Sequence, residues 1–351
     1  MGSCSSGTVN SKASKKTGTL IKYANCIEMD SLKDGVIAHL IQPEIKDTFK
    51  FYLSSQPTHT PIGYTFLKVP ITNLSVLSST QVGMLDKLNC IPLISSISDK
   101  RFVYNRRLKK QLIERKTVSI GQLDNVSIEQ LLKSSPQAIL FSGFSGELPQ
   151  SEVLKKAHIS PIPIFDWKEQ HPLGKAEWIK FIGYLVGKPN EANDYFMELD
   201  VRYNRLKRSN TNTGPSIFCG NLTGDIWYTP TGQSYQAKLL MDAGANYQYA
   251  KTQGVGSLSF SIEQVIKDNL STEIWLNPGM HEMKQLKTIH PMVRHFKSVK
   301  TNKVYCYSHA MNKYWELAAI EPDKVLSDLI QLVHFNGKGT EKLYFYAKVS
   351  N

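Results

Sequence analysis

The sequence predicts an α/β fold of two Rossmann-like lobes, each with a central and mostly parallel sheet, joined by one long α-helix with a ligand cleft between the lobes. Two observations predict this fold. Short strand-like segments alternate with helical segments after Pro70, and the alternation starts again after the polar break at residues 209–215. Between the two series, residues 191–208 carry a helical pattern. A chain of 351 residues also exceeds the length at which a single core stays convenient.

The amino-terminal lobe is expected at residues 18–188, after a polar and flexible tether at residues 1–17. Its first part is rich in β-branched and aromatic residues between polar and proline breaks, which is typical of strands. The expected strands lie at residues 23–29, 36–41, 49–53 and 63–69, then at 71–77, 91–94, 138–141 and 163–165. The helices expected among the later strands lie at residues 79–88, 128–132 and 152–157.

Two helices are expected at the centre of the chain. The first spans residues 173–186 and is ended by Gly187 and Pro189. The second places Tyr195, Leu199 and Tyr203 at helical spacing, and its 18 residues give a length of roughly 27 Å. We assign residues 189–210 to this connecting helix. Because a helix of that length is a stiff bridge, we expect little movement between the lobes.

The carboxyl-terminal lobe is expected at residues 211–351. Its predicted strands lie at residues 216–220, 273–276 and 304–307, and its predicted helices at residues 234–243, 262–267 and 322–334. The alternation again favours a largely parallel sheet.

The tetrapeptide Ser-Ile-Glu-Gln occurs twice, beginning at Ser127 and at Ser261. Each copy opens a helical segment that precedes a core strand. One explanation is local, because serine is a good N-cap and the helix dipole favours a glutamate in the first turn. The other is functional: one exposed glutamate on each lobe, Glu129 and Glu263, would meet equivalent basic sites on a two-fold symmetric partner.

Composition describes an ordinary globular protein, with 41% hydrophobic and 21% charged residues. No stretch approaches the roughly 18 apolar residues of a transmembrane span. The net charge of +12 is scattered, and the densest basic stretch, residues 100–110, is explained by a solvated helix face. Since no nucleic-acid-binding motif accompanies it, we expect no nucleic-acid partner. An anionic ligand or a membrane surface suits the excess of positive charge.

The five cysteines are widely separated and show no metal-binding or redox spacing. Four of them are interpreted as small buried hydrophobes. Cys4 differs, because it follows Met-Gly-Ser and precedes the polar tether. Met1 and Gly2 with Ser6 fit a myristoylation pattern. Alternatively, Met-Gly-Ser is an expression scar in place of a signal peptide, and Cys4 is the first residue of a mature bacterial lipoprotein.

Several segments together resemble the substrate-binding proteins of ATP-driven (ABC) importers, in the branch that carries ferric siderophores, haem and cobalamin. These segments are residues 71–80, 84–88, 126–140, 172–180, 232–245 and 312–317. The resemblance covers nearly the whole chain after the tether. It depends on the order and spacing of the segments, since no single motif is as sharp as a Walker A loop.

The resemblance implies two lobes joined by one helix that close only slightly around a ligand. It also implies that Glu129 and Glu263 dock on arginines of a dimeric ABC permease, and it supports lipidation of Cys4. We therefore expect a monomeric receptor in the bacterial periplasm, held to a membrane by a lipid anchor. Residues near Cys4 lack the acidic side chains that would indicate surface export.

Aromatic side chains are concentrated where loops follow the carboxyl ends of predicted strands, which is where α/β proteins bind ligands. The predicted ligand contacts are Arg101, Phe102, Phe144, Trp167, Trp227, Tyr228, His309, Tyr314 and Trp315. Flat aromatic surfaces suit a porphyrin, a corrin or a catecholate siderophore. Trp227 and Tyr228 are the preferred contacts, because turn-forming residues flank them and predict exposure.

The residues leave the choice among these ligands open. Cobalamin-binding relatives carry a tryptophan before each docking glutamate, whereas this chain has residues 121–124 and 256–258 without one. Arg101 or Lys68 could pair with an anionic ferric chelate. His309 and Met311 are known types of axial ligand for haem.

A free metal ion and an enzymatic site are both weaker interpretations. His281, His290 and His295 do not form a recognised ligand set, so no metal site and no cofactor are expected. The sequence has no nucleophile elbow, zinc-protease motif or P-loop. We expect no enzyme, and the alternative is an α/β enzyme of unknown chemistry that uses the same cleft.

Overall fold

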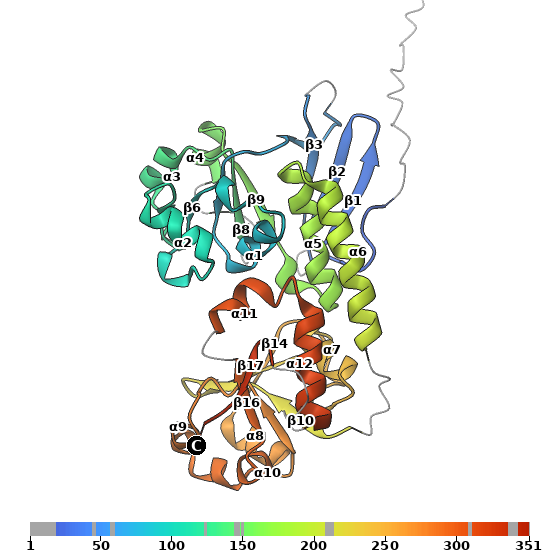
Figure 1. Ribbon diagram of the computed structural model, residues 1–351, viewed down its shortest axis with the longest axis vertical. Coiled ribbons are helices and arrows are strands. Elements are labelled where there is room, and N and C mark those ends of the chain that lie inside the picture. Colours follow the sequence, from blue (N-terminus) through green and yellow to red (C-terminus); the bar gives the residue numbers. More distant parts are fainter. Residues whose placement is uncertain are drawn as a thin grey trace, which may run out of the picture.

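The computed structural model has two α/β lobes joined by one long helix, which confirms the predicted fold class (Figure 1). It describes residues 19–43, 47–56, 60–122, 125–143, 148, 151–207, 214–307, 311–335 and 343–350. In Figure 1 the amino-terminal lobe lies above the carboxyl-terminal lobe, and helices α5 and α6 run along one side.

The amino-terminal lobe is built on a parallel sheet with the strand order β7-β6-β5-β8-β9. Its strands are β5 (Leu74–Val76), β6 (Ile94–Ile97), β7 (Val118–Ser119), β8 (Ala138–Ser142) and β9 (Ser160–Ile164). Its helices are α1 (Ser79–Lys87), α2 (Arg106–Ile113), α3 (Ile128–Ser134) and α4 (Ser151–Lys156), with short 3-10 turns η1 (Ile91–Leu93), η2 (Lys100–Phe102) and η4 (Asp166–Lys168). The predicted strand at residues 91–94 is wrong in its first three residues, where Pro92 sits in η1.

The carboxyl-terminal lobe has the strand order β13-β10-β15-β16-β17, in which only β17 is antiparallel to its neighbour. These strands are β10 (Ser216–Cys219), β13 (Asn246–Tyr247), β15 (Ile274–Leu276), β16 (Val304–Tyr307) and β17 (Tyr346–Lys348). A second sheet contains β11 (Asn221–Thr223), β12 (Ile226–Pro230) and β14 (Ser257–Phe260). The helical segments are α7 (Tyr235–Asp242), α8 (Ile262–Asn269), α9 (Met283–Ile289), η5 (Pro291–His295), α10 (Lys297–Lys300), α11 (Met311–Leu317) and α12 (Pro322–Phe335).

Both parallel sheets reverse their strand order once. In the amino-terminal lobe the reversal lies between β5 and β8, and in the carboxyl-terminal lobe it lies between β10 and β15. The loops at the carboxyl ends of such neighbouring strands diverge to opposite faces of the sheet and leave a crevice, where open α/β proteins bind ligands. The topology therefore predicts a ligand site near the carboxyl ends of these strands.

Helix α6 (Pro189–Leu206) connects the lobes, and α5 (Pro172–Leu185) precedes it in the amino-terminal lobe and packs against it. Gly187 adopts a φ of +73°, which ends α5, and Pro189 begins α6 where its missing N–H costs nothing. The connecting helix is stabilised by a buried face that includes Phe196, Leu199 and Tyr203. Within the described residues, no helix combines the length and the apolar character needed to cross a membrane.

A separate four-stranded sheet precedes the first lobe. Its strands are β1 (Ile27–Leu32), β2 (Gly35–Gln42), β3 (Asp47–Ser54) and β4 (Thr65–Lys68), in sequential order, with β3 and β4 parallel and the other pairs antiparallel. In Figure 1 this sheet, in blue, rises beside α5 and α6.

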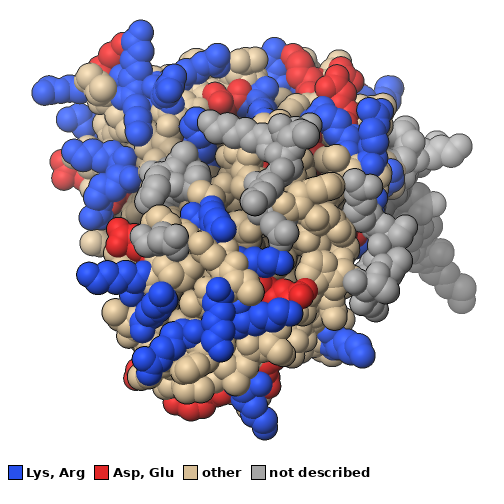
Figure 2. Space-filling view, turned by 60° about the horizontal axis from the view of Figure 1, so that its bottom comes forward, with Lys and Arg blue, Asp and Glu red and all other residues tan. Residues whose placement is uncertain are grey.

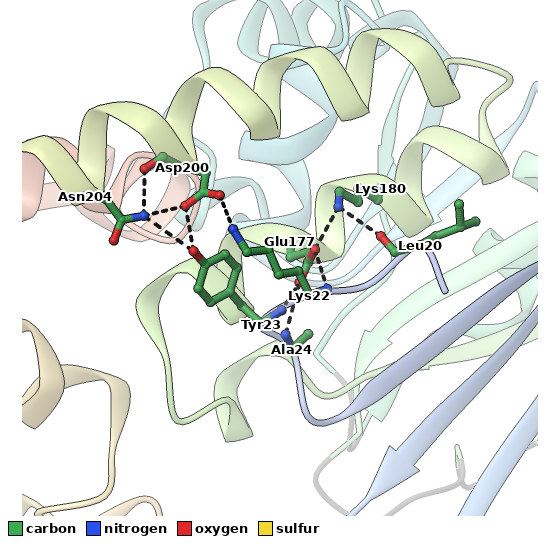
Figure 3. A network of polar contacts seen from close by, with 8 residues as sticks. All are labelled: Leu20, Lys22, Tyr23, Ala24, Glu177, Lys180, Asp200 and Asn204. Atoms are coloured by element: carbon green, nitrogen blue, oxygen red, sulfur yellow. Dashed lines mark hydrogen bonds and ion pairs between the residues drawn. The ribbon is translucent and has the colours of Figure 1, made fainter. Parts of the chain in front are cut away.

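Residues 22–24, shortly before β1, are held by a side chain and not by a strand partner, so the predicted strand at residues 23–29 is wrong at its start. Glu177 on α5 is fully buried and accepts hydrogen bonds from the main-chain N–H groups of Lys22, Tyr23 and Ala24, at 2.9, 2.7 and 3.1 Å. Figure 3 shows Lys22 and Tyr23 reaching Asp200 on α6. Because a side-chain carboxylate satisfies these N–H groups, the segment needs no sheet neighbour.

Candidate ligand site between the lobes

Four tyrosines gather at the carboxyl-terminal side of the interlobe region. We call Tyr235, Tyr307, Tyr314 and Tyr346 the tyrosine cluster. Tyr307 ends β16, where it lies opposite Tyr346 of β17, and its ring stacks on that of Tyr314 with centroids 3.7 Å apart. Tyr235, the first residue of α7, lies close enough to influence the ionisation of Tyr307 and Tyr314. The cluster thus lies at the carboxyl end of β16, the strand next to β15 in the parallel sheet.

The amino-terminal lobe contributes a buried ion pair to the same region. Asp166 follows the carboxyl end of β9, and its Oδ2 lies 3.5 Å from Nζ of Lys175 on α5. The same ammonium lies 4.5 Å from the ring centroid of Tyr235. Burial works against the charged ammonium, but Tyr235 and Asp166 raise the pKa of Lys175 above its ordinary value. A cation of one lobe therefore faces an aromatic ring of the other.

The phenols of Tyr307, Tyr314 and Tyr346 are protonated at neutral pH. Burial raises the pKa of Tyr307, Tyr314 and Tyr346 above that of free tyrosine, and neighbouring phenols add to the shift for Tyr307. Neutral phenols donate hydrogen bonds, whereas phenolates would ligate a bare ferric ion. With Lys175, the cluster is suited to oxygen acceptors on a negatively charged ligand.

Helix α11 links this region to the amino-terminal lobe by packing on α1. A Cβ built on Gly83 would lie only 1.7 Å from the carbonyl oxygen of Glu316, so no larger residue fits this contact. The buried Glu316 carboxylate accepts hydrogen bonds from the N–H groups of Tyr104 and Asn105, both at 2.8 Å. Lys87 on α1 also pairs with Glu321, at 2.5 Å. The lobes are therefore in direct contact beside the tyrosine cluster.

Several predicted contacts lie at the surface. Phe102, Tyr228 and Trp315 are exposed, with Trp315 meeting Tyr307 at a centroid distance of 5.8 Å. The Arg101 guanidinium forms hydrogen bonds to Asp99 at 2.8 and 2.6 Å, so its charge is already paired. Trp167 lies in η4 with the Lys168 ammonium 4.1 Å from its ring centroid. Their contacts with a ligand stay predictions.

The expected exposure of Trp227 is wrong. Its side chain is fully buried in a second core, where its ring packs on Phe218 and Trp275 at centroid distances of 6.1 and 5.4 Å. Its indole N–H donates to the carbonyl of Cys219 at 3.2 Å. Strand β12 alternates, so Trp227 points into the core and Tyr228 points out. Trp227 therefore cannot contact a ligand at the surface in this structure.

Three sequence-predicted positions, Cys4, Phe144 and His309, lie outside the described residues. The buried environment predicted for the other cysteines is confirmed, since Cys26, Cys90, Cys219 and Cys306 are buried free thiols. Within the part of the chain that the structure describes, no three His, Cys, Asp or Glu side chains come together as a metal site.

The two predicted docking glutamates occupy equivalent local positions. Glu129 lies in the first turn of α3 and Glu263 in the first turn of α8, and both are exposed. Each helix is capped by the serine of its tetrapeptide, whose hydroxyl accepts the N–H of Gln130 at 3.4 Å or of Gln264 at 3.3 Å. Main-chain N–H bonding at the helix start lowers the pKa of Glu263. The predicted N-caps are confirmed, whereas docking stays a prediction.

Sequence reasoning missed Asp166, Lys175, Tyr235 and Tyr346 as members of the site. One signal was available for Lys175, because α5 is an apolar helix that nevertheless buries three charged residues, Lys175, Glu177 and Lys180. A buried charge requires a partner. The sequence alone does not show which partner, since Tyr235 comes from the other lobe.

Two α/β lobes joined by a single helix, with polar and aromatic side chains meeting between them, are the architecture that this chain shares with solute-binding proteins of similar fold. The chain belongs to the periplasmic binding protein family, whose model matches residues 74–310. Its members bind and hand over solutes for ABC transport, so this protein is a binding protein and not an enzyme.

Individual relatives agree with this family. The chain is 27% identical to an uncharacterized lipoprotein of Methanocaldococcus jannaschii over 81% of this chain and 70% of the relative. Its fold is similar to a periplasmic heme binding protein from Pseudomonas aeruginosa, with a TM-score of 0.62, 13% identity, and coverage of 80% and 99% of the two chains. A periplasmic vitamin B12 binding protein of Vibrio cholerae gives a TM-score of 0.54, 10% identity, and coverage of 77% and 99%.

Proposed function

We propose that this protein captures a metal chelate, namely a ferric siderophore, haem or cobalamin, and delivers it to a dimeric ABC permease. The observation that carries the proposal is the meeting of Lys175 from one lobe with Tyr235 from the other, beside the tyrosine cluster. A ligand held there touches both lobes at once and can therefore stabilise one relative orientation of the two.

The chemistry of the site favours a chelate with an aromatic or flat body and oxygen acceptors at its edge. Tyr235 and Tyr307 are only half-buried, so their rings can stack on a ligand, while Tyr314 and Tyr346 lie buried behind them. Lys175 supplies a cation for a carboxylate or catecholate oxygen. The heme- and vitamin B12-binding proteins of similar fold support this class of ligand.

Delivery would use the two exposed glutamates. Glu129 and Glu263 stand one on each lobe at the start of a helix, which suits equivalent basic sites on two permease subunits. The molecule as a whole is basic, with a net charge of +12, and Figure 2 shows Lys and Arg side chains spread widely over one face.

We place the protein outside the cytoplasm, where its family works, with a lipid on Cys4 as its membrane anchor. The relative from Methanocaldococcus jannaschii carries the name lipoprotein, which supports the anchor. In the sequence, mostly polar residues lie between Cys4 and Thr19, the first residue that the structure describes. Mass spectrometry of the protein from native membranes would detect the lipid, and an unmodified Cys4 would contradict the anchor.

Titration of the purified protein with haemin, ferric siderophores and cyanocobalamin tests the ligand proposal. We expect one of these chelates to bind with one-to-one stoichiometry and to be recovered chemically unchanged. Tyr235→Ala should weaken that binding at least tenfold, whereas Tyr344→Ala, which removes an exposed tyrosine outside the cluster, should leave it unchanged. Equal effects of the two substitutions, or conversion of the chelate, would contradict the proposal.

A further inference from the structure

A cavity of about 450 Å³ lies between the four-stranded sheet β1–β4, here called the amino-terminal sheet, and the parallel-sheet part of the amino-terminal lobe. Strands β3 and β4 contribute Phe49, Phe51 and Thr65 to its wall, and the lobe contributes Phe141 and Pro163. The family model begins at residue 74, so one wall of the cavity comes from a part of the chain that the family model does not cover. None of its lining residues belongs to the interlobe site.

The sequence of β9 explains why the cavity stays open. Strand β9 is the edge of its sheet and reads Ser-Pro-Ile-Pro-Ile. The N–H of Ser160 donates to the carbonyl of Gln137, just before β8, and the carbonyl of Ile164 accepts from the N–H of Gly143, just after β8. The main-chain groups of the even-numbered residues of β9 therefore face the sheet. The alternate positions, Pro161 and Pro163, face the open edge and have no N–H to donate.

A proline-bearing edge cannot be extended by another strand. The amino-terminal sheet consequently approaches this part of the lobe through side chains, as in the contact between Phe49 and Phe165 at a centroid distance of 6.0 Å. The edge of β9 lacks the N–H groups that a neighbouring strand would need. The two sheets therefore meet through aromatic rings, with space between them. The cavity lies where these aromatic side chains meet the proline-bearing edge of β9.

The lining of the cavity has an apolar body and a polar margin that includes one lysine. Phe49, Phe51 and Phe141 supply aromatic walls, while Lys155 of α4 and the exposed His158 lie at its border. Lys155 pairs with Glu152 at 2.9 Å, and because both side chains are more than half exposed, water screens this pair. The volume lies in the range of small-molecule sites.

We propose that this cavity is a second ligand site, which binds an apolar carboxylate of the fatty-acid type. The hydrocarbon body lies among the phenylalanine rings, where it is removed from water, and the carboxylate lies against Lys155 and His158. The site is independent of chelate binding between the lobes.

Calorimetric titration of the whole protein with decanoate tests this site, with decanol as the neutral analogue. We expect one decanoate per chain, and at least tenfold weaker binding of decanol. Thr65→Trp, a change at an exposed lining position, should fill the cavity and weaken decanoate binding at least tenfold. Its thermal unfolding should match that of the unaltered protein.

Two neighbouring lysines provide a matched comparison. Lys155→Glu should weaken decanoate binding at least tenfold, whereas Lys156→Glu, which makes the same charge change at an exposed lysine that does not line the cavity, should have no effect. Absence of decanoate binding, binding that survives Thr65→Trp, or equal effects of the two lysine substitutions would each overturn the proposal. Tyr235→Ala should leave decanoate affinity unchanged, so this test stands whatever the outcome for metal chelates.

Discussion

Lys175 of the amino-terminal lobe lies 4.5 Å from the ring centroid of Tyr235 of the carboxyl-terminal lobe, and its second partner, Asp166, is 3.5 Å away. The ammonium therefore has two roles that can be separated. It neutralises a carboxylate that is 2% exposed, and it places a positive charge against an aromatic ring of the other lobe.

Replacing Lys175 by methionine should affect both roles. Asp166 would be left as a buried and unpaired charge, so we expect the free energy of unfolding to fall by about 3–5 kcal/mol. The double variant Lys175→Met, Asp166→Asn removes both charges and should regain most of that stability. Urea unfolding followed by tryptophan fluorescence measures the difference.

The same two variants test the role in ligand binding. Chelate affinity should be lost in the single variant and should stay low in the double variant, although the double variant is stable. If the double variant bound the chelate as tightly as the unaltered protein, Lys175 would be a structural residue only.

The contact between Gly83 and Glu316 gives a second prediction. Gly83→Ala places a methyl group where the carbonyl oxygen of Glu316 now lies, so α11 must move away from α1. Overpacking of this kind costs about 1–3 kcal/mol. Because α11 carries Tyr314 of the tyrosine cluster, chelate affinity should fall together with the melting temperature.

Ser79→Ala is the control for this substitution, because Ser79 lies on the same helix and its hydroxyl makes only a hydrogen bond to the Phe102 carbonyl at 3.3 Å. Calorimetric melting of both variants measures the effect. An unchanged melting temperature in Gly83→Ala would show that the two lobes do not depend on this contact.

The fold could be predicted from the sequence because its signals are local. Alternating strands and helices, the helical spacing of Tyr195, Leu199 and Tyr203, and proline and glycine at helix ends each depend on neighbours within a few residues. The start of the first strand was misjudged because Glu177, more than 150 positions later in the chain, binds the N–H groups of residues 22–24. No local pattern contains that information.

The candidate site was less predictable than the fold. The turn residues that flank Trp227 predict that its side chain is exposed. The alternation of β12 instead decides which of Trp227 and Tyr228 faces the core. Lys175 and Tyr235 are far apart in the sequence and meet only because two separate sheets direct their strand ends to the same space. The residue types in the sequence predict an aromatic site. Which residues form that site can be told only from the tertiary structure.

Reversing the charge of the docking glutamates should separate transport from binding. Glu129→Lys with Glu263→Lys should reduce uptake of the chelate by cells at least tenfold, because each lysine would face a basic site on the permease. Chelate affinity of the purified variant should be unchanged, since both side chains are exposed.

Glu191→Lys is the matched control for docking, because Glu191 is also an exposed first-turn glutamate but lies on the connecting helix. Uptake assays in cells that express each variant at equal level compare the two. Normal uptake with the double charge reversal, or equal loss with Glu191→Lys, would remove the docking role from Glu129 and Glu263.

His171 should make stability sensitive to mildly acidic pH. It is the N-cap of α5, where its Nδ1 accepts the N–H of Leu173 at 3.1 Å, and its ring stacks on Tyr23 at a centroid distance of 5.0 Å. Burial and then the nearby Lys238 ammonium lower the pKa of His171 to about 4 from 6.5, whereas Asp242 opposes this shift. Protonation would also break the cap, because a protonated Nδ1 cannot accept.

The lowered pKa of His171 should make the folded protein less stable as the pH falls. Between pH 6.5 and 4 the unfolded chain binds a proton at His171 that the folded protein does not, so stability is lost as the pH falls through this window. We expect a loss of about 1 kcal/mol by pH 5.5, above the range in which ordinary carboxylates titrate. His171→Asn keeps a cap acceptor and does not titrate, so its stability should change less between pH 7 and 5.5. Thermal unfolding at several pH values compares the two proteins, and parallel curves would mean that His171 does not set the acid sensitivity.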